Sequence, residues 1–129
     1  MNKKQTLLIV DDNRNFVDRM ICLIEEVSNI GAIHTAGDYD EARKLLSHEK
    51  PDVALLDINI PGKSGIELLK LVKKYNSECK VIMITNHADE YYRQQCYDLG
   101  AEYFLDKSND FALVPGILSK SNLDENELV

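Results

Sequence analysis

Three short apolar runs mark the chain, and each of them ends at a polar residue. They occupy residues 7–10, 53–56 and 81–84. Continuous apolar runs of this length are typical of strands that are buried on both faces of a sheet. Two further segments, residues 32–36 and 102–105, mix polar and apolar positions, as expected for strands at the edges of a sheet. The pattern therefore predicts five strands, three central and two lateral.

The segments between these strands show helical periodicity. After the first strand, apolar residues recur every three or four positions, which places them along one side of a helix. These residues are Phe16, Met20, Leu23, Ile24 and Val27. The first connection is therefore expected to be a helix whose apolar side faces the core.

Two further helices carry a start signal. Asp38 with Glu41, and Ser64 with Glu67, have the spacing of a capping box. In that motif the first side chain and the glutamate each accept a hydrogen bond from a backbone amide that the helix leaves unpaired. We therefore expect the second and third helices to begin near Asp38 and Ser64.

The last two helices are marked by the residues that end or interrupt them. Tyr92, Cys96 and Leu99 form an apolar stripe that stops at Gly100, and glycine suits the left-handed conformation just past a helix end. Pro115 has no amide hydrogen and would interrupt a helix that began a few residues earlier. The sequence predicts a regular fourth helix and a fifth helix with an irregular first part.

Strand and helix alternate five times along the chain. This order predicts an α/β fold in which a parallel sheet is covered by helices on both faces through right-handed crossovers. A flavodoxin-like, doubly wound, five-stranded parallel sheet with strand order 2-1-3-4-5 places the two polar strands at the edges. We expect one domain over residues 1–121, followed by a short acidic tail over residues 122–129.

Composition agrees with one domain and narrows its setting. The chain has 129 residues, of which 44% are hydrophobic, enough for a single core. Its longest apolar runs are far shorter than the roughly twenty residues that cross a bilayer. Three cysteines without a closely spaced pair indicate neither a disulfide framework nor a zinc site. A reducing, cytoplasmic location is expected.

The net charge bears on the choice of partners. At −7, the chain would repel the phosphates of nucleic acids and anionic lipids, which proteins bind through summed positive charge. Direct binding to nucleic acid or to a membrane is therefore not expected. Divalent cations and basic protein surfaces remain compatible with this charge.

Reactive side chains stand at the ends of four predicted strands. Asp11 and Asp12 follow the first strand, Asp57 follows the third, Thr85 ends the fourth, and Lys107 comes shortly after the fifth. Ligands of open parallel sheets bind outside the carboxyl ends of the strands. The five side chains are therefore expected to converge on one edge of the sheet.

Crowded carboxylates repel one another unless a cation balances their charge. Mg²⁺ binds oxygen, keeps several waters and commonly combines one or two carboxylates with phosphoryl oxygens. We expect Asp12 and Asp57 to supply carboxylates, and Asp57 to be the nucleophile that accepts a phosphoryl group. Lys107 and Thr85 would bind the new phosphoryl oxygens through a point charge and a hydroxyl. Drawing their loops toward Asp57 would convert chemistry into a change of shape.

Four segments together resemble the receiver domain of bacterial response regulators, from about Thr6 to Lys120. They are Leu-Ile-Val-Asp-Asp (8–12), Asp-Ile-Asn-Ile-Pro-Gly-Lys-Ser-Gly (57–65), Ile-Thr-Asn (84–86) and Gly-Ala-Glu-Tyr-Phe-Leu-Asp-Lys (100–107). The resemblance implies a stand-alone, phosphorylation-activated signalling switch that catalyses only its own phosphorylation and dephosphorylation. The donor would be a phosphohistidine on a sensor histidine kinase or phosphotransfer protein, and the output a changed affinity for a downstream effector protein.

The same resemblance implies how the metal is held. It makes Asp57 the phosphoacceptor and gives Mg²⁺ a direct ligand in Asp12, a water-mediated ligand in Asp11 and a main-chain oxygen ligand in Asn59. Asn59 and His87 occupy positions that influence how water reaches the aspartyl phosphate. The lifetime of the phosphorylated state is therefore left open.

On the phosphoryl side, the resemblance implies that Thr85 and Lys107 bind the transferred group. Phe104, three residues before the lysine, matches the aromatic switch that turns inward when the threonine is drawn in. Two neighbours depart from the family pattern. Ser108 replaces a proline that usually follows a cis peptide bond, which costs far more without proline. Asn86 replaces a small residue after the threonine and is expected to narrow the approach to the acceptor.

Three other functions remain open on the sequence alone. A receiver cut from a longer regulator would carry the same motifs. A Mg²⁺-dependent phosphatase of the haloacid dehalogenase type also uses a strand-end aspartate, but it normally has a second aspartate two residues on, where this chain has Asn59, and a cap or a larger core. A constitutive interaction module would keep the fold without turning over phosphate, which the intact Asp57 and Lys107 argue against.

Overall fold

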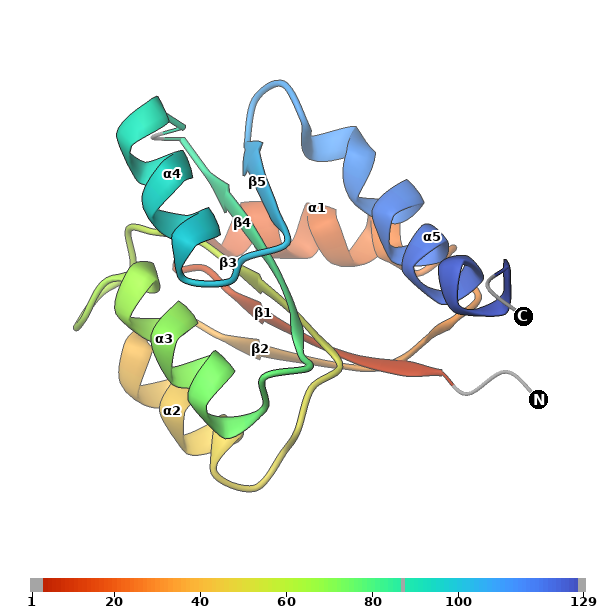
Figure 1. The fold of residues 1–129 in the computed structure, drawn as a ribbon, viewed down its shortest axis with the longest axis horizontal. Coiled ribbons are helices and arrows are strands. Elements are labelled where there is room, and N and C mark those ends of the chain that lie inside the picture. The colour runs from red at the N-terminus through yellow and green to blue at the C-terminus, as the bar shows by residue number, and fades with distance from the viewer. Residues whose placement is uncertain (1–3, 87, 128–129) are drawn as a thin grey trace.

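The computed structural model describes residues 4–86 and 88–127, and the side chains of those up to residue 120. Strands and helices alternate along the chain, and a short 3₁₀ helix precedes the last α-helix (Figure 1). The strands are β1 (Gln5–Val10), β2 (Ile30–Ala36), β3 (Val53–Leu56), β4 (Lys80–Thr85) and β5 (Tyr103–Asp106). The helices are α1 (Arg14–Ile24), α2 (Tyr39–Leu46), α3 (Gly65–Tyr75), α4 (Glu90–Asp98), η1 (Phe111–Leu113) and α5 (Val114–Glu127).

The five strands form one parallel sheet in the order β2-β1-β3-β4-β5. This confirms the predicted α/β class, the strand order and the two lateral strands. The observed β1 and β2 each begin two residues before the predicted runs, at Gln5 and Ile30. In β1 the extra residues are the polar Gln5 and Thr6, which the apolar pattern did not reach, and in β2 Gly31 interrupts the pattern after Ile30.

Alternate residues of the central strands point to opposite faces of the sheet. Leu8 and Val10 of β1 belong to the cluster packed against α2, α3 and α4, whereas Leu7 and Ile9 belong to the cluster packed against α1 and α5. Helices therefore cover both faces (Figure 1). Four of the five predicted core residues of α1 and its C-terminal extension are buried, and only Leu23 is half-buried.

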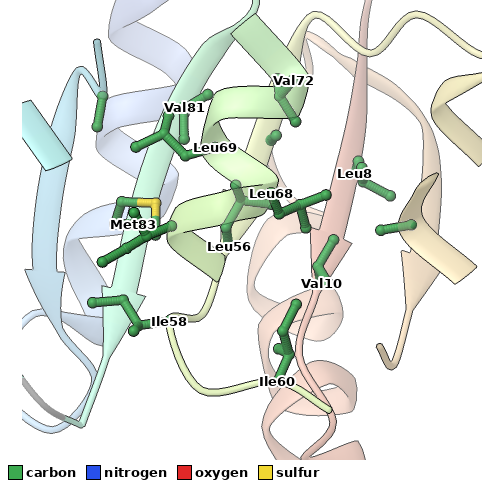
Figure 2. Packing of buried hydrophobic residues seen from close by; sticks show 14 of the residues in the cluster. Leu8, Val10, Leu56, Ile58, Ile60, Leu68, Leu69, Val72, Val81 and Met83 are labelled. Atoms are coloured by element: carbon green, nitrogen blue, oxygen red, sulfur yellow. The ribbon is translucent and has the colours of Figure 1, made fainter. Parts of the chain in front are cut away.

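The larger cluster packs α3 against the centre of the sheet (Figure 2). Leu68, Leu69 and Val72 of α3 are almost completely buried and face the strands that carry Leu56 and Met83. Full burial of a leucine-sized side chain contributes roughly 1.5–3 kcal/mol. This packing holds the N-terminus of α3, which lies next to the end of β3, in a defined place.

The second and third helices begin where the capping signals predicted. The Asp38 side chain accepts a hydrogen bond from the Glu41 amide at 2.8 Å, and the Ser64 side chain accepts one from the Glu67 amide at 3.4 Å. The reciprocal bonds differ from a capping box. Glu41 accepts from the Gly37 amide at 2.8 Å, and Glu67 forms an ion pair along its own helix. Both glutamate side chains are exposed, and each interacts with a donor other than the amide of the cap residue.

The last two helices also follow the sequence. α4 ends just before Gly100, whose φ of 105° lies in the left-handed region that favours glycine. Pro115 lies in the first turn of α5, and the irregular segment before it is η1. Because α5 continues to Glu127, the boundary at residue 121 falls within a helix, and the division into domain and tail stays a prediction.

In the described part of the chain, no helix has both the length and the apolar character needed to span a membrane.

The three cysteines lie in two environments. Cys22 is exposed on α1, whereas Cys79 and Cys96 are buried, and all three are free. Burial raises the pKa of the Cys79 thiol to about 12 and that of the Cys96 thiol to about 11. Since the thiolate is the reactive form, both buried cysteines are protected by inaccessibility and by protonation.

A thiol titration should therefore separate Cys22 from the other two. At mildly alkaline pH, a disulfide reagent such as DTNB should react rapidly with one thiol of the folded protein and with all three after denaturation in urea. The Cys22→Ser variant should lack the rapid phase. Rapid reaction of a second thiol in that folded variant would show that Cys79 or Cys96 is accessible.

Candidate functional site

The predicted strand-end residues meet at one edge of the sheet. Lys107 Nζ lies 2.6 Å from Asp11 Oδ2 and 3.0 Å from Asp57 Oδ2. Carboxylate oxygens of Asp11, Asp12 and Asp57 lie within 4.8 Å of one another. Thr85 ends β4, and its main-chain oxygen accepts a hydrogen bond from the Lys107 amide at 3.0 Å. All five residues are brought together.

The turn from β1 into α1 positions the first two carboxylates. The Asp11 amide donates to the Ala36 carbonyl at 3.0 Å, and Asp11 Oδ1 accepts from the Asn13 amide at 2.8 Å. The Asn13 side chain caps α1 by accepting from the Phe16 amide at 3.1 Å. Asp11 is thereby held in a buried position, while Asp12 is exposed at the rim.

The close approach of α3 positions Asp57. The amide of Gly65, the first residue of α3, donates to the Ile58 carbonyl at 2.7 Å. A Cβ atom on Gly65 would lie 1.9 Å from the Asp57 carbonyl oxygen, so only glycine fits there. Asp57 Oδ1 accepts from the Asn59 amide at 3.3 Å. The acceptor carboxylate is thus held both by its own loop and by the helix that follows.

Burial and charge oppose each other in this cluster. Burial raises the pKa of Asp11, as does the charge of Asp57, and the hydrogen bonds from Lys107 and Asn13 offset this only in part. Burial alone would lower the pKa of Lys107, but its hydrogen bonds to Asp11 and Asp57 raise that pKa overall. The ammonium of Lys107 contacts two of the three carboxylates in the cluster, so negative charge remains in excess.

This donor set fits a hard divalent cation. Carboxylates offer oxygen ligands, which Mg²⁺ and Ca²⁺ prefer. Burial, with a smaller contribution from the charge of Asp57, raises the pKa of Asp11, and a bound cation would stabilise its ionised form. The exposed Asp12 leaves one side of the cluster open to solvent, as suits an ion that keeps several waters. Asp11, Asp12 and Asp57 together could therefore hold a divalent cation.

Carboxylates also shape the loop that presents Lys107. The peptide bond before Ser108 is trans. The amides of Ser108 and Asn109 donate to Asp106 Oδ1 at 2.8 Å and 3.3 Å, and the Asp106 amide donates to Asp110 Oδ2 at 2.8 Å. A proline at this position would have no amide hydrogen to donate. The hydrogen bond from the Ser108 amide is therefore one that a proline at this position could not make.

A groove of about 490 Å³ opens beside the site. Lys107 and Phe16 contribute to its lining, together with Asn86, which is exposed. A role for Asn86 in narrowing the approach to Asp57 agrees with this position and stays a prediction. His87, the other residue considered near the rim, lies outside the described residues.

The sequence did not reveal two contacts made by the cations near the site. Lys107 Nζ lies 4.4 Å from the centroid of the Phe16 ring, and the guanidinium carbon of Arg93 lies 5.2 Å from the centroid of the Phe104 ring. Periodicity marked Phe16 only as a core residue and gave no sign of Arg93. Both contacts join elements that are distant in sequence, so no local pattern encodes them.

Comparison with known proteins identifies the family. The family model described as the response regulator receiver domain matches residues 7–117. The chain belongs to this family. Receiver domains of response regulators are phosphorylation-activated signalling switches.

Two similar proteins come from Bacillus subtilis (strain 168). Sporulation initiation phosphotransferase F is 36% identical over 103 residues, which cover 78% of each chain. Alkaline phosphatase synthesis transcriptional regulatory protein PhoP is 34% identical over 107 residues, which cover 83% of this chain but 43% of PhoP. The chain thus spans less than half the length of PhoP.

The fold is also close to that of solved receiver domains. A crystal structure of a CheY-like response regulator receiver domain protein from Methanospirillum hungatei JF-1 matches with a TM-score of 0.82 and 28% sequence identity. The match covers 97% of this chain and 98% of that one. Nearly the whole of this receiver domain therefore superimposes on a known receiver domain structure.

Replacing Gly65 with alanine should strain the backbone of Asp57. The methyl group would occupy the space of the Asp57 carbonyl oxygen, so the free energy of unfolding should fall by roughly 1–3 kcal/mol. Urea unfolding measures this loss. Gly116→Ala is the matched control, because a Cβ there meets nothing within 4 Å and alanine favours a helix by about 0.8–1 kcal/mol. Equal stability of Gly65→Ala and wild type would contradict the close approach.

Removing the charge of Asp11 should stabilise the receiver domain in EDTA. Because its pKa is raised, ionised Asp11 costs free energy in the folded state at neutral pH. Asp11→Asn should therefore raise the urea midpoint at neutral pH, and the gain should shrink as the pH falls toward 3.8, the ordinary value of the carboxyl. Added Mg²⁺ should raise the midpoint of the wild type more than that of the variant.

The exposed Asp18 on α1 provides the control for this comparison. Asp18→Asn removes the same charge far from any buried partner, so it should change the urea midpoint little in either EDTA or Mg²⁺. An Asp11→Asn variant that is less stable than wild type in EDTA at neutral pH would contradict the assigned charge imbalance.

Proposed function

We propose that this receiver domain is a Mg²⁺-dependent switch in which Asp57 accepts the phosphoryl group. The observation that carries the proposal is the contact of Lys107 Nζ with both Asp57 and Asp11, at 3.0 Å and 2.6 Å. A lysine held in this way can pass from a carboxylate oxygen to a phosphoryl oxygen without leaving the site. The same ammonium then serves the free and the phosphorylated acceptor.

The proposed transfer is a displacement at phosphorus. One Asp57 oxygen attacks the phosphorus atom while the phosphorus–nitrogen bond of the donor phosphohistidine breaks and the imidazole leaves. Asp12, Asp57 and the main-chain oxygen of Asn59 would hold Mg²⁺, with Asp11 acting through water, and the ion would neutralise charge on the phosphoryl oxygens. Lys107 pairs with one phosphoryl oxygen, and the Thr85 hydroxyl donates to another. The domain catalyses only its own phosphorylation and dephosphorylation.

The proposed response begins at Thr85. This residue is fully buried at the end of β4, and its backbone is bonded to that of Lys107. Engaging the phosphoryl oxygens would draw both residues toward Asp57 and would favour the inward position of Phe104, which is 2% exposed. The surface formed by α4 and β5 would then change its affinity for an effector protein.

The partners follow from this chemistry. The donor is proposed to be a sensor histidine kinase or a phosphotransfer protein, which agrees with the alignment to sporulation initiation phosphotransferase F over 78% of each chain. A place within a longer regulator is the second candidate, because the aligned part covers 43% of PhoP. A cytoplasmic setting is proposed from the three free cysteines.

Phosphorylation should depend entirely on Asp57. Incubation with acetyl phosphate or beryllofluoride plus Mg²⁺ should add one labile group to the wild type and none to Asp57→Ala, as measured by intact-mass spectrometry. EDTA should prevent the addition, because the metal balances the charge of the incoming group. The expected effect is a complete loss rather than a partial one, since no other carboxylate contacts Lys107 together with Asp11 in the described part of the chain.

The exposed Asp18 again serves as the control, and Asp18→Ala should be modified like the wild type. An adduct that persists in Asp57→Ala would refute the assignment of the acceptor. Sustained hydrolysis of unrelated phosphate esters would support the haloacid dehalogenase-type phosphatase instead, although Asn59 stands where that class normally has its second aspartate.

A further inference from the structure

The helix α4 is held to the sheet by few buried side chains. Among its nine residues, only Cys96 is buried, whereas α3 buries five of its eleven. The N-terminal half of α4, residues 90–95, therefore has no buried residue of its own. Its half-buried residues are Tyr92, Arg93 and Gln95, and Tyr91 is exposed. The position of this half-helix must depend on the few contacts that these residues make.

Arg93 makes such a contact with Phe104. Its guanidinium carbon lies 5.2 Å from the ring centroid, while the side chain itself is 39% exposed. The Phe104 ring is 2% exposed, so Arg93 covers a ring that is otherwise surrounded by the core. A cation at this distance from an aromatic face is attracted by the ring's quadrupole, and more strongly when water is partly excluded. The contact therefore stabilises the inward position of the Phe104 ring.

Arg93 is also held along its own helix. Its Nε lies 3.6 Å from Glu90 Oε2, one turn earlier. Glu90 is 83% exposed, and exposed ion pairs of this kind contribute little to stability. Most of the free energy that places the Arg93 side chain should therefore come from the ring of Phe104 rather than from Glu90.

Phe104 in turn lies close to the proposed phosphoryl site. It is paired with Met83 in the register of β4 and β5, and Thr85 is paired with Asp106 in the same ladder. Lys107 follows on the same strand end and bonds to the Thr85 carbonyl. Phe104 is thus joined to α4 through Arg93 and to the end of β4 through the strand ladder, in which Thr85 pairs two residues further along β5.

We propose that Arg93 is a positioning residue that keeps the Phe104 ring inward and thereby couples α4 to the phosphoryl site. It acts through Phe104 and not on the reacting atoms. The coupling to phosphorylation rests on the proposed function of Asp57, whereas the hold on the ring does not. Loss of the guanidinium raises the population in which the ring leaves the core, and a smaller fraction of molecules then has the arrangement that binds a phosphoryl group.

The first measurement follows the ring itself. Fluorine NMR of protein labelled with 4-fluorophenylalanine gives three resonances, for Phe16, Phe104 and Phe111, and a Phe104→Leu variant assigns the one in question. A soluble paramagnetic agent reports its exposure. In Arg93→Met, which keeps an unbranched apolar stem but not the guanidinium, the Phe104 resonance should broaden more than in wild type. Arg93→Lys should broaden less than Arg93→Met, and Glu90→Gln should match the wild type.

The second measurement tests the coupling. Beryllofluoride with Mg²⁺ serves as the phosphoryl mimic, and its affinity is obtained by titration of the same NMR signals. Arg93→Met should weaken the affinity by roughly threefold to tenfold. In a Phe104→Leu background, the same substitution should have no further effect, because its action passes through the ring. If Arg93 had only a structural role, Arg93→Met would lower the unfolding midpoint in both the wild-type and the Phe104→Leu backgrounds. Its effect on beryllofluoride affinity would then not differ between the two backgrounds.

The outcomes separate the inference from the proposed function. If wild type binds no beryllofluoride at Asp57, the proposed function fails, and the fluorine spectra still decide whether Arg93 holds the ring. If the Phe104 resonance of Arg93→Met is as protected as that of wild type, the inference is overturned. It is likewise overturned if beryllofluoride binds both proteins equally or if the two substitutions act additively.

Discussion

One lysine ammonium, shared between two buried carboxylates, is the contact on which the site depends. Lys107 lies 2.6 Å from Asp11 and 3.0 Å from Asp57, and these like charges would repel each other without it. The contact requires β1 and β3 to be neighbours and β5 to lie two strands from β3, as the order β2-β1-β3-β4-β5 provides. The topology of the sheet is therefore the condition for the charge balance.

The helices α3 and α4, on the two sides of the site, differ in how many side chains they bury against the sheet. On the acceptor side, α3 buries Leu68, Leu69 and Val72, and Gly65 touches the backbone of Asp57. On the other side, α4 buries only Cys96. Local rearrangement costs the free energy of the contacts that it breaks, so the thinly packed element moves first. We therefore expect α4 to rearrange at a lower cost in free energy than α3.

The sequence predicted the fold and the convergence of Asp57, Thr85 and Lys107, because buried parallel strands read as apolar runs and their carboxyl ends share one edge. It could not predict the direction of the Asp11 pKa, which depends on how deeply that carboxylate is buried. The stacking of Arg93 on Phe104 was also invisible, because it depends on side-chain directions in two elements. The helix caps were predicted only in part. Asp38 and Ser64 accept the expected hydrogen bonds, but Glu41 and Glu67 interact with donors other than the cap amides.

Ser108 shows how a departure from the family pattern is accommodated. A proline restrains both the folded and the unfolded chain, whereas the amides of Ser108 and Asn109 are fixed only through Asp106, whose own amide is bonded to Asp110. These hydrogen bonds join residues two to four positions apart, so they form local turns. The loop that presents Lys107 is therefore ordered by the side chains of Asp106 and Asp110 and not by a proline ring. Hydrogen bonds can re-form at slightly different lengths, so this loop has more freedom to adjust the position of Lys107 than a loop restrained by proline.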